Sequence, residues 1–487
     1  MNRSVIRYLI GKILLIEALL LILPSIVSLI YRENWQHIAS YVGTAIGLGL
    51  LGFGLSYRKP DNFKIRTRDG LVTVALGWIL LSLFGAIPFV LTGEIPNPFD
   101  AFFEVASGFT TTGSSILSDL SVLAHSSLFW RSFTHFVGGM GVLVFTMAIL
   151  PNSSDYVELM RAEVPGPVFG KLVSKLSRTA RILYGLYFVL TLAIAIVLVI
   201  AKVPLFDALL LAFGTTGTGG FAINNAGFSI YANPAAVEWI IGVGMLLSGI
   251  NFNVYYFILL GYAKDVLKND EELRYYLGIV GVVVALICVN IQSLYTSLEP
   301  LVRNVFFTVA SIITTTGYST ADFDQWPLFS QILVVMLMFI GGCAGSTAGG
   351  IKMSRIIMYF KSALAELHRA GTPKRKVVPM LSGKAISKEI EAQIAHYLLV
   401  YITLYVVILL SVSLEVSDFT TAFTSVIATF NNIGPGLAQV GPTRNFSFYS
   451  NWNTLVLTFS MIAGRLEIFP VLLLFSPKTL KRFISAK

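Results

Sequence analysis

The sequence of 487 residues has little charge for its length. Only 13% of its residues are Asp, Glu, Lys or Arg, whereas 55% are hydrophobic and the mean hydropathy is +0.75. A soluble protein of this size would carry roughly twice that charged fraction. Apolar runs of about 20 residues or more recur from one end of the chain to the other. This composition excludes a large soluble domain and indicates an all-helical, polytopic membrane protein.

Cysteine is also scarce, and the sequence lacks the clusters that mark catalytic or metal sites. Cys288 and Cys343 both lie in apolar segments and give no disulfide framework. The acidic residues are scattered, which argues against a membrane enzyme, because such an enzyme needs paired acids or a His/Cys cluster at a membrane face. His135 and Glu238 lie in or near apolar segments without ligand spacing or a partner, so we expect structural roles for them.

Ten segments are long enough to span a membrane. The predicted spans are 5–31, 38–57, 70–93, 129–150, 181–202, 235–262, 275–298, 328–358, 392–415 and 452–475. The first of them is too long for a cleavable signal peptide and has no small-residue cleavage site.

The basic residues gather on alternate connections between the predicted spans. Lys and Arg concentrate at the N-terminus, in the loops 58–69 and 151–181, between 264 and 274, between 352 and 388, and from 478 to the end. By the positive-inside rule these connections are cytoplasmic, and so are both termini. The net charge of +9 is therefore explained by topology next to membrane lipid rather than by nucleic-acid binding.

Four short apolar segments lie between the longer ones, and each runs into Thr or Asn and then Gly. They are Phe99–Gly113, Phe206–Gly219, Arg303–Gly317 and Thr420–Gly434. A dozen helical residues reach only about 18 Å, whereas a hydrocarbon core is about 30 Å thick. Non-helical backbone at that depth is tolerated only where it is buried in protein or lines water. We therefore expect four re-entrant loops around one pore, all entering from the outer side.

The four segments align on a glycine and form a repeat. Gly113, Gly219, Gly317 and Gly434 are separated by 106, 98 and 117 residues. In this alignment Asp207 precedes its glycine by 12 residues, whereas the equivalent residues of the other copies precede theirs by 13, so the second copy is one residue shorter. Each copy reads span, short helix, Gly loop, span. Parallel repeats around an axis along the membrane normal predict a pseudo-fourfold arrangement with the pore on that axis.

This pattern divides the chain into five parts. They are an N-terminal two-helix unit at 1–66, repeat 1 at 67–151, repeat 2 with a cytoplasmic lead-in at 152–265, repeat 3 with a broken inner helix at 266–360, and a cytoplasmic basic loop with repeat 4 at 361–487.

The residue types in the four loops suit a monovalent cation. A pore helix that enters from outside points its C-terminus at the axis, where its dipole places roughly half a negative charge. Extended Thr-Thr-Gly backbone can aim carbonyl oxygens inward, and such rings replace an ion's hydration shell. The loops hold no Asp or Glu, which disfavours a tight divalent site; Asp100, earlier on the first pore helix, is expected to cap that helix, and Glu104 follows it. The candidate filter residues are Thr111, Thr112, Gly113, Gly217, Thr218, Gly219, Thr315, Thr316, Gly317, Asn432, Ile433 and Gly434.

A glycine-rich stretch interrupts the predicted span 328–358. Residues 341–350 read GGCAGSTAGG, and each glycine costs about 1 kcal/mol in a helix interior. We expect the helix to break here, on the cytoplasmic side of the third loop, and the segment to act as a gate that plugs the pore. The alternatives are a small-residue helix-packing face and a kink without gating; the phosphate-loop pattern is absent. The candidate gate residues are Gly341, Gly342, Gly345, Gly349, Gly350 and Arg465.

Arg465 lies near the middle of the predicted span 452–475. A mid-bilayer Arg costs about 2.5–3.5 kcal/mol on insertion scales, which makes it a functional candidate. We expect it to face the pore beneath the filter and to slow ion passage. The alternative is an ion pair with Glu467 or with an acid of another helix. Asn251 and Asn253 either line the pore or cross-link helices.

Several of these motifs together resemble the TrkH/KtrB/HKT superfamily of potassium transporters. They are HFVGGMGVLVFTMAILP at 135–151, the loops TTTG, TGTGGF, TTTG and NNIGPG, GGCAGSTAGGIK at 341–352, and AGRLEIF at 463–469. The resemblance runs through the whole chain. The extra N-terminal pair of spans is similar to that of the TrkH/TrkG branch.

The resemblance implies a potassium-uptake channel of the bacterial inner membrane that forms a homodimer with one pore per subunit. K⁺ is then the transported ion, and the chain holds no organic cofactor. Gly113, Gly219, Gly317 and Gly434 would mark the filter, and the segment at 341–350 with Arg465 would form the gate. A cytosolic ring of nucleotide-binding regulatory subunits of TrkA type is the implied partner, docking on basic inner loops such as 361–388, with AGTPKRK at 370–376.

The sequence leaves three functions open. Besides a potassium channel, these are a Na⁺- or H⁺-coupled K⁺ symporter and a sodium-conducting member of the same family. We find no chain of buried Asp, Glu or His, which disfavours proton coupling, whereas sodium coupling through backbone oxygens would leave no mark. The loops TGTGGF and NNIGPG depart from TTTG, but Gly113 favours potassium, because plant relatives that transport sodium have Ser at the first glycine.

Overall fold

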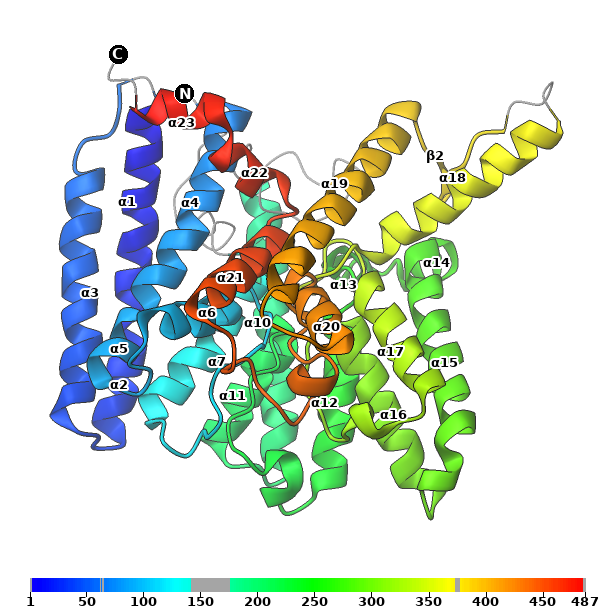
Figure 1. The fold of residues 1–487 in the computed structure, drawn as a ribbon, viewed down its shortest axis with the longest axis horizontal. Helices are drawn as coiled ribbons and strands as arrows, with labels where there is room; N and C mark the ends of the chain where they lie inside the picture. The colour runs from blue at the N-terminus through cyan, green and yellow to red at the C-terminus, as the bar shows by residue number, and fades with distance from the viewer. Residues whose placement is uncertain (1, 62, 64, 142–175, 373–376, 485–487) are drawn as a thin grey trace.

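The computed structural model describes residues 2–61, 63, 65–141, 176–372 and 377–484. The second half of the predicted span 129–150, most of the predicted basic loop 151–181 and residues 373–376 of AGTPKRK lie outside the described residues. The described chain is helical apart from its connections and one hairpin of β1 (Met380–Leu381) and β2 (Lys384–Ala385). The predicted all-helical, polytopic fold is confirmed (Figure 1).

Two antiparallel helical columns form an N-terminal unit at one edge of the molecule (Figure 1). The first column is α1 (Arg3–Leu20) continued by α2 (Ile22–Ile30), and the second is α3 (Trp35–Ser56). Glycines let the columns approach closely, because a Cβ at Gly11 would lie 2.7 Å from the carbonyl oxygen of Gly52. This unit matches the two N-terminal spans expected from the sequence.

The rest of the chain repeats one pattern four times: a long first helix, a short helix, a loop and a second helix. The first helices are α4 (Thr67–Gly85) with its extension α5 (Ile87–Thr92), α10 (Leu176–Ile200), α15 (Glu271–Ile291) and α19 (Lys388–Ser413). The short helices are α6 (Pro98–Phe109), α11 (Leu205–Gly217), α16 (Leu298–Ile313) and α20 (Phe419–Phe430). The second helices are α7 (His125–Gly139), α12 (Pro234–Ser248), α17 (Leu328–Ile340) and α21 (Asn451–Arg465).

The second helices are shorter than predicted. Among the described residues six helices are long and apolar enough to cross a membrane, or seven if the bent pair α12 and α13 (Phe252–Leu259) counts as one span. In all four repeats the second helix ends after 13 to 15 residues. The sequence predicted continuous spans at 235–262 and 452–475, and a break only in the third repeat, so these expectations were wrong.

Close packing against the short helices explains where the second helices end. A Cβ at Gly138 would collide with the carbonyl oxygen of Phe109, at the end of α6, and a Cβ at Gly464 would collide with that of Phe430, at the end of α20. Beyond this level the chain turns: α13 lies at 89° to α12, and Glu467 has a positive φ before α22 (Phe469–Phe475) begins. The remaining elements are α14 (Ala263–Asn269), α18 (Met353–Gly371), α23 (Pro477–Ile484) and the 3-10 turns η2 (Gly227–Ile230), η3 (Gln292–Leu294), η4 (Phe323–Gln325) and η5 (Ala438–Val440).

Side-chain caps start the short helices of the first and fourth repeats. The N-cap of α6 is Asn97, whose side chain accepts a hydrogen bond from the amide of Phe99, and Asp100 lies in the first turn; the expectation that Asp100 is the cap was wrong. Asp418 caps α20 by accepting from the amide of Thr421 at 2.9 Å. The Thr421 hydroxyl also donates to Asp418 and, together with that amide, holds the pKa of the carboxyl below its usual value.

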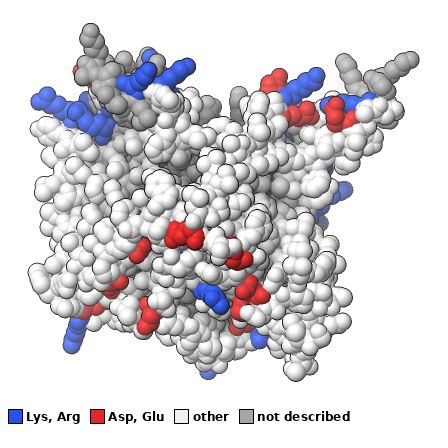
Figure 2. Space-filling view, in the orientation of Figure 1, with Lys and Arg blue, Asp and Glu red and all other residues white. Residues whose placement is uncertain are grey.

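The two faces of the bundle differ in their share of basic and acidic side chains. Both chain ends lie on one face, which we call the terminal face; the other is the opposite face (Figure 1). Lys and Arg crowd the terminal face beside a few Asp and Glu, whereas Asp and Glu outnumber Lys and Arg in the half toward the opposite face (Figure 2). A band between the terminal face and the middle of the molecule shows few charged side chains (Figure 2), as expected for surface in contact with lipid.

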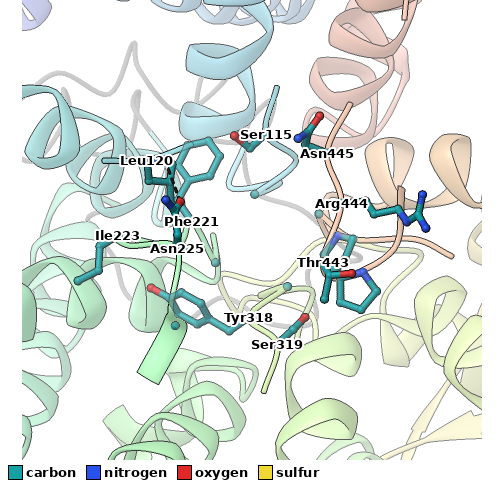
Figure 3. A pocket seen from close by; sticks show the side chains of 18 of the residues that line it. Ser115, Leu120, Phe221, Ile223, Asn225, Tyr318, Ser319, Thr443, Arg444 and Asn445 are labelled. Atoms are coloured by element: carbon teal, nitrogen blue, oxygen red, sulfur yellow. Dashed lines mark hydrogen bonds between the residues drawn. The ribbon is translucent and has the colours of Figure 1, made fainter. Parts of the chain in front are cut away.

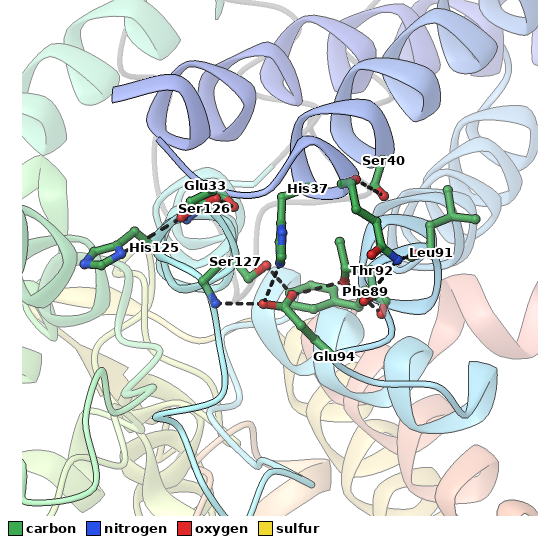
Figure 4. Close-up of polar contacts among 12 residues, drawn as sticks. Glu33, His37, Ser40, Phe89, Leu91, Thr92, Glu94, His125, Ser126 and Ser127 are labelled. Carbon is green, nitrogen blue, oxygen red and sulfur yellow. Dashed lines mark hydrogen bonds and ion pairs between the residues drawn. The ribbon is translucent and has the colours of Figure 1, made fainter. Parts of the chain in front are cut away.

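Carboxylates fix the N-terminal unit to the first repeat at the opposite face (Figure 4). Glu33, between α2 and α3, accepts from the amide of Ser126 at 2.9 Å, and Glu94 accepts from the amide of Ala124 at 2.7 Å. His37 Nε2 lies 3.4 Å from a Glu94 oxygen. Because the amides belong to the start of α7, both carboxylates act as N-terminal caps that favour the helix dipole.

Candidate functional site

The four short helices end in loops that share one hydrogen-bond pattern. In each loop one backbone amide donates to the carbonyl oxygen five residues earlier, over 2.8 to 2.9 Å. The donors are Thr112, Gly219, Thr316 and Ile433, and the acceptors are Ser107, Gly214, Ser311 and Ala428. These donors are therefore equivalent positions of the four repeats.

This equivalence corrects the predicted alignment of the second repeat. The four matching triplets are Thr111–Gly113, Thr218–Gly220, Thr315–Gly317 and Asn432–Gly434. The glycine equivalent to Gly113 is thus Gly220 rather than Gly219, and Gly217 is the last residue of α11. The predicted triplet was one residue too early, because the run TGTGG offers two adjacent glycines. Asp207 lies 13 residues before Gly220, so the second copy is not shorter than the others.

The first residue of each triplet has a left-handed backbone. The φ angle is 55° at Thr111 and 56° at Thr218, Thr315 and Asn432. This conformation is unusual for a β-branched residue and costs about 1–3 kcal/mol. Three threonines at equivalent positions carry that cost, and the surrounding fold must impose it. Such strain clusters at binding and catalytic sites.

The last residue of each triplet closes the four loops into a ring. A Cβ at Gly113 would collide with the carbonyl oxygen of Gly219, in the next loop along the chain. The same holds for Gly220 against Thr316, for Gly317 against Ile433 and, at 2.9 Å, for Gly434 against Thr112. The contacts run in chain order and return to the first loop. Glycine is needed at these positions both for the positive φ and for the close approach.

A cavity of about 470 Å³ lies on the ring. All four triplet glycines line it, together with the segments that lead from each loop to its second helix (Figure 3). Tyr318 and Phe221 line its wall, whereas Arg444 points away from its centre (Figure 3). The four loops thus surround an open, mostly uncharged space.

Two side-chain oxygens of the left-handed residues lack a partner within the described ranges. Thr111 Oγ1 and Asn432 Oδ1 are buried and accept or donate no hydrogen bond among the described residues. The amide nitrogen of Asn432 is used instead: it donates to Thr112 Oγ1 and to the Met461 carbonyl, both at 2.9 Å. Asn432 therefore joins loop 4 to loop 1 and to α21, which explains why this loop has Asn in place of Thr.

A buried ion pair holds the first two loops, and its arginine is among the residues that line the cavity. Arg131, on α7, lies 2.7 Å from Glu104, on α6, and its guanidinium also donates to the carbonyl of Ala222 at 3.1 Å. Glu104 in turn accepts from the Ser115 hydroxyl and the Ile116 amide, both at 3.0 Å. Arg131 is not among the site residues predicted from the sequence. The available signal was an acid on a short apolar helix together with a base in the following apolar span.

The glycine-rich segment 341–352 breaks the helix as predicted and lies under the third loop. The Gly349 amide donates to Thr315 Oγ1 at 2.6 Å, so the segment touches the ring directly. Its other end is fixed by Glu272, which accepts from the Ala344 amide at 2.7 Å. Since the segment is not helical, the alternative of a helix-packing face was wrong. Positive φ at Gly341, Gly345 and Gly350 explains why glycine recurs here.

The same segment packs against the break between α12 and α13. The Cys343 amide donates to the Gly249 carbonyl at 2.9 Å, and the Phe252 amide donates to the Gly345 carbonyl at 3.1 Å. Asn251 lies against Gly345 and accepts from the Asn253 amide at 2.9 Å. Asn251 therefore helps to join this break to the segment.

Arg465 connects the segment to the first repeat. Its guanidinium donates to the Thr347 carbonyl at 2.7 Å, and to the carbonyls of Gly138 and Gly139 at 2.6 and 2.7 Å. The last two carbonyls end α7, where the helix dipole favours a cation. The expected alternative, a pair with Glu467, was wrong, because Glu467 binds Arg355 at 2.7 Å.

His135 and Glu238 are engaged in structural contacts. The Nδ1 of His135 lies 2.8 Å from the Gly108 carbonyl and its Nε2 accepts from the Phe221 amide at 3.3 Å, which fits a neutral ring. Glu238 lies 2.7 Å from Arg303, so the expectation that it lacks a partner was wrong. Among the described residues no group of three or more His, Cys, Asp and Glu could hold a metal ion.

The fold and the ring together define a multi-pass membrane protein built around four convergent backbone loops. Residues 44–482 match the TrkH family, which is described as a cation transport protein family. The chain belongs to this TrkH family.

Relatives of this family match nearly the whole chain. "Trk system potassium uptake protein TrkH" of Salmonella typhimurium is 34% identical and covers 98% of this chain and 99% of its own. "Trk system potassium uptake protein TrkG" of Escherichia coli is 31% identical, with the same coverage. The crystal structure of the potassium transporter TrkH from Vibrio parahaemolyticus matches with a TM-score of 0.87 at 31% identity, covering 98% of this chain and all of that one.

Proposed function

We propose that this protein takes up potassium across the bacterial inner membrane through a gated pore, with the ring of four loops as its filter. The observation that carries the proposal is the closed ring of strained triplets at the ends of four short helices. Relatives that cover its full length are named as potassium uptake proteins. These names describe transport and no enzymatic reaction.

The chemistry of the ring suits a monovalent cation. Four helix C-termini meet there, and each contributes roughly half a negative charge. Backbone carbonyls of the triplets replace the hydration shell, and the unpaired oxygens of Thr111 and Asn432 add neutral ligands. The triplets contain no carboxylate, so a divalent ion would lack charged ligands. We therefore assign the filter to the predicted residues of the first, third and fourth loops and to Thr218, Gly219 and Gly220 of the second.

The segment 341–350 and Arg465 form the proposed gate. In this arrangement the segment lies directly under the ring, with the Gly349 amide on Thr315. Arg465 holds it there through the Thr347 carbonyl. Opening requires the segment to leave this position, which breaks a charge-assisted hydrogen bond worth about 1.5–3 kcal/mol.

We assign the terminal face to the cytoplasm. Its excess of Lys and Arg fits the positive-inside rule. The acids in the half toward the opposite face then lie on the outer side and raise the local concentration of cations there. We also propose the predicted division of the chain into five parts, with boundaries after residues 66, 151, 265 and 360.

The proposed partners are a second copy of this chain and a cytosolic nucleotide-binding regulatory subunit of TrkA type. The relatives are named as parts of a Trk system, which supports a multi-component assembly. The regulatory subunit would dock on the terminal face, near the basic residues between 361 and 388.

Tracer flux into liposomes tests the function. Purified protein should take up rubidium when driven by a rubidium gradient alone, without any gradient of sodium or protons, and should take up sodium at least about tenfold more slowly, which equals about 1.4 kcal/mol of discrimination. Liposomes without protein are the blank. Rubidium uptake that requires a sodium or proton gradient would establish a symporter instead, and equal sodium and rubidium flux would establish a sodium-conducting protein.

A further inference from the structure

A carboxyl group lies at the middle of the first membrane-crossing column. The column α1–α2 runs from Arg3 to Ile30, and Glu17 is 14 residues from its start and 13 from its end. At a rise of about 1.5 Å per residue, Glu17 is about 20 Å from either end. This depth places it near the centre of the hydrocarbon region.

Glu17 is fully buried, and neither of its carboxyl oxygens has a hydrogen-bond partner in the part of the chain that the structure describes. Burial of a polar group without a partner is costly, and burial of an isolated carboxylate is far more costly. Acidic residues at this depth usually pair with a base or line a polar cavity. Among the described residues no salt bridge includes Glu17.

The carboxyl group faces the back of the first pore helix. A Cβ built on Gly85, at the end of α4, would lie 3.2 Å from Glu17 Oε1, 3.1 Å from a methyl carbon of Val105 and 3.3 Å from the ring of Phe109. Val105 and Phe109 belong to α6, and Phe109 is two residues before Thr111. The site therefore joins the N-terminal unit to the helix that carries the first filter loop.

Charged and titratable groups on the neighbouring elements are engaged elsewhere. On α6, Glu104 binds Arg131. On α4, Asp69 lies in the first turn and accepts from the amide of Asn2 at 3.1 Å, about 24 Å along the helix from Gly85. On α3, Tyr41 contacts the Ser127 hydroxyl and His37 lies beside Glu94. None of them compensates a negative charge at Glu17.

A metal ion does not fit this position either. Na⁺ or K⁺ would need several oxygen ligands, whereas the groups that converge with the carboxyl on Gly85 are the apolar side chains of Val105 and Phe109. The Gly85 carbonyl already accepts from the indole nitrogen of Trp130 at 3.0 Å. The proton is the one cation that needs no further ligands.

We propose that Glu17 is an intramembrane proton-binding site, held as a neutral carboxylic acid, through which the N-terminal unit packs on the first pore helix. The proton stays bound at neutral pH. Ionisation would place an uncompensated charge behind α6 and oppose this packing. The proposal does not depend on which ion passes the pore.

A hydrophobic carbodiimide provides the chemical probe, because it reacts with protonated carboxyls in apolar surroundings. The carboxyl proton moves to one carbodiimide nitrogen, and the carboxyl oxygen bonds to the central carbon. The acyl group then shifts from oxygen to nitrogen to give a stable N-acylurea that retains all atoms of the reagent. No oxidant, reductant or leaving group is needed.

The experiment treats the full-length protein in liposomes with dicyclohexylcarbodiimide at neutral pH and locates the adduct by mass spectrometry. Glu17 should be labelled at least about tenfold faster than the exposed Glu389, because an exposed Glu is ionised at this pH. A water-soluble carbodiimide should reverse this order. Glu17→Gln should lose the fast adduct and keep rubidium flux within about twofold, since the amide reproduces the neutral acid at a cost below about 0.4 kcal/mol.

Infrared spectroscopy provides a second measurement that does not require reagent access. The spectrum of the wild-type protein minus that of Glu17→Gln should contain the C=O band of a protonated carboxylic acid. A carboxylate band at neutral pH in that difference would overturn the proposal. So would a tenfold loss of flux in a folded Glu17→Gln protein, because the charge itself would then be required.

Discussion

Thr111, Thr218, Thr315 and Asn432 carry the same left-handed backbone although their side chains make different contacts. Thr218 Oγ1 donates to the Gly217 carbonyl at 2.7 Å, and Thr315 Oγ1 accepts from the Gly349 amide at 2.6 Å. Thr111 Oγ1 has no partner among the described residues. The backbone geometry is therefore the shared property, and the side chains adapt to four different surroundings. A repeat of this kind is recognised by its hydrogen bonds better than by residue identity.

The corrected register gives a direct test at Gly220. Gly220→Ala should lower rubidium flux by more than tenfold, because the positive φ costs about 1 kcal/mol and the new Cβ collides with the Thr316 carbonyl. Gly227→Ala is the matched control: its φ is also positive, at 61°, but nothing lies within 4 Å of the added carbon. Flux through both variants is measured in liposomes. Equal flux in the two would refute the assignment of Gly220 to the ring.

The buried pair of Arg131 and Glu104 should dominate the stability of the first two loops. Arg131→Met leaves Glu104 buried without a counter-charge and should destabilise the folded protein by about 3–5 kcal/mol. The double variant Glu104→Gln with Arg131→Met should recover part of that loss. Thermal unfolding in detergent measures both.

An exposed pair serves as the comparison. Glu366 is 73% exposed and lies 2.8 Å from Arg369, and Glu366→Gln should change stability by less than about 1 kcal/mol. An Arg131→Met protein as stable as Glu366→Gln would show that the buried pair contributes little.

At the scale of the helices, the arrangement of the repeats depends on where each helix ends. The sequence predicts some of these ends and not others. The short helices were predictable from their length and their closing glycines, and the break at 341–350 from its glycine content. The breaks after α12 and α21 could not be predicted, because the segments 235–262 and 452–475 are continuously apolar. These helices end where they pack against a part of the chain distant in sequence, as Gly464 does against Phe430 of the short helix in the same repeat. Apolar periodicity records burial and carries no information about such long-range contacts.

The contacts of Arg465 could not be predicted from the sequence either. The sequence predicts that this residue is functional, because an arginine in the middle of an apolar span is costly. Its acceptors are backbone carbonyls of residues 118 and more than 300 positions away. Since every residue has a carbonyl, no residue type marks such an acceptor in a sequence.

The segment under the ring should be released when Arg465 is neutralised. Arg465→Gln removes the charge-assisted hydrogen bond to Thr347, which is worth about 1.5–3 kcal/mol and hence tenfold or more in the population of the closed segment. Basal rubidium flux should therefore rise by at least about tenfold. Arg303→Gln, which breaks a pair with Glu238 far from the segment, should leave the flux unchanged. An unchanged flux in a folded Arg465→Gln protein would contradict the gate.

Across the whole molecule, basic side chains dominate the terminal face and acidic ones are more numerous in the other half (Figure 2). A cation that approaches the opposite face meets acidic groups first, and the basic terminal face lies beyond the ring. The membrane orientation then decides which direction of flow this arrangement favours.

Cysteine labelling tests that orientation. Single cysteines are introduced by Ser229→Cys, at an exposed position of the opposite face, and by Lys478→Cys, at an exposed position of the terminal face, with Cys288→Ser as background. In intact cells a membrane-impermeant maleimide should label only the first. The second should react only after permeabilisation. The reverse pattern would place both termini outside and invert the proposed direction of uptake.

One polypeptide supplies all four quarters of the ring, each with its own codons. In a ring of four identical chains, one mutation alters every quarter at once. Here one mutation alters a single quarter, as the Asn432 triplet illustrates by differing from its three counterparts. Variants with one, two, three or four altered quarters can therefore be made on demand. The dependence of ion discrimination on the number of intact quarters becomes a measurable dose–response curve in a single gene.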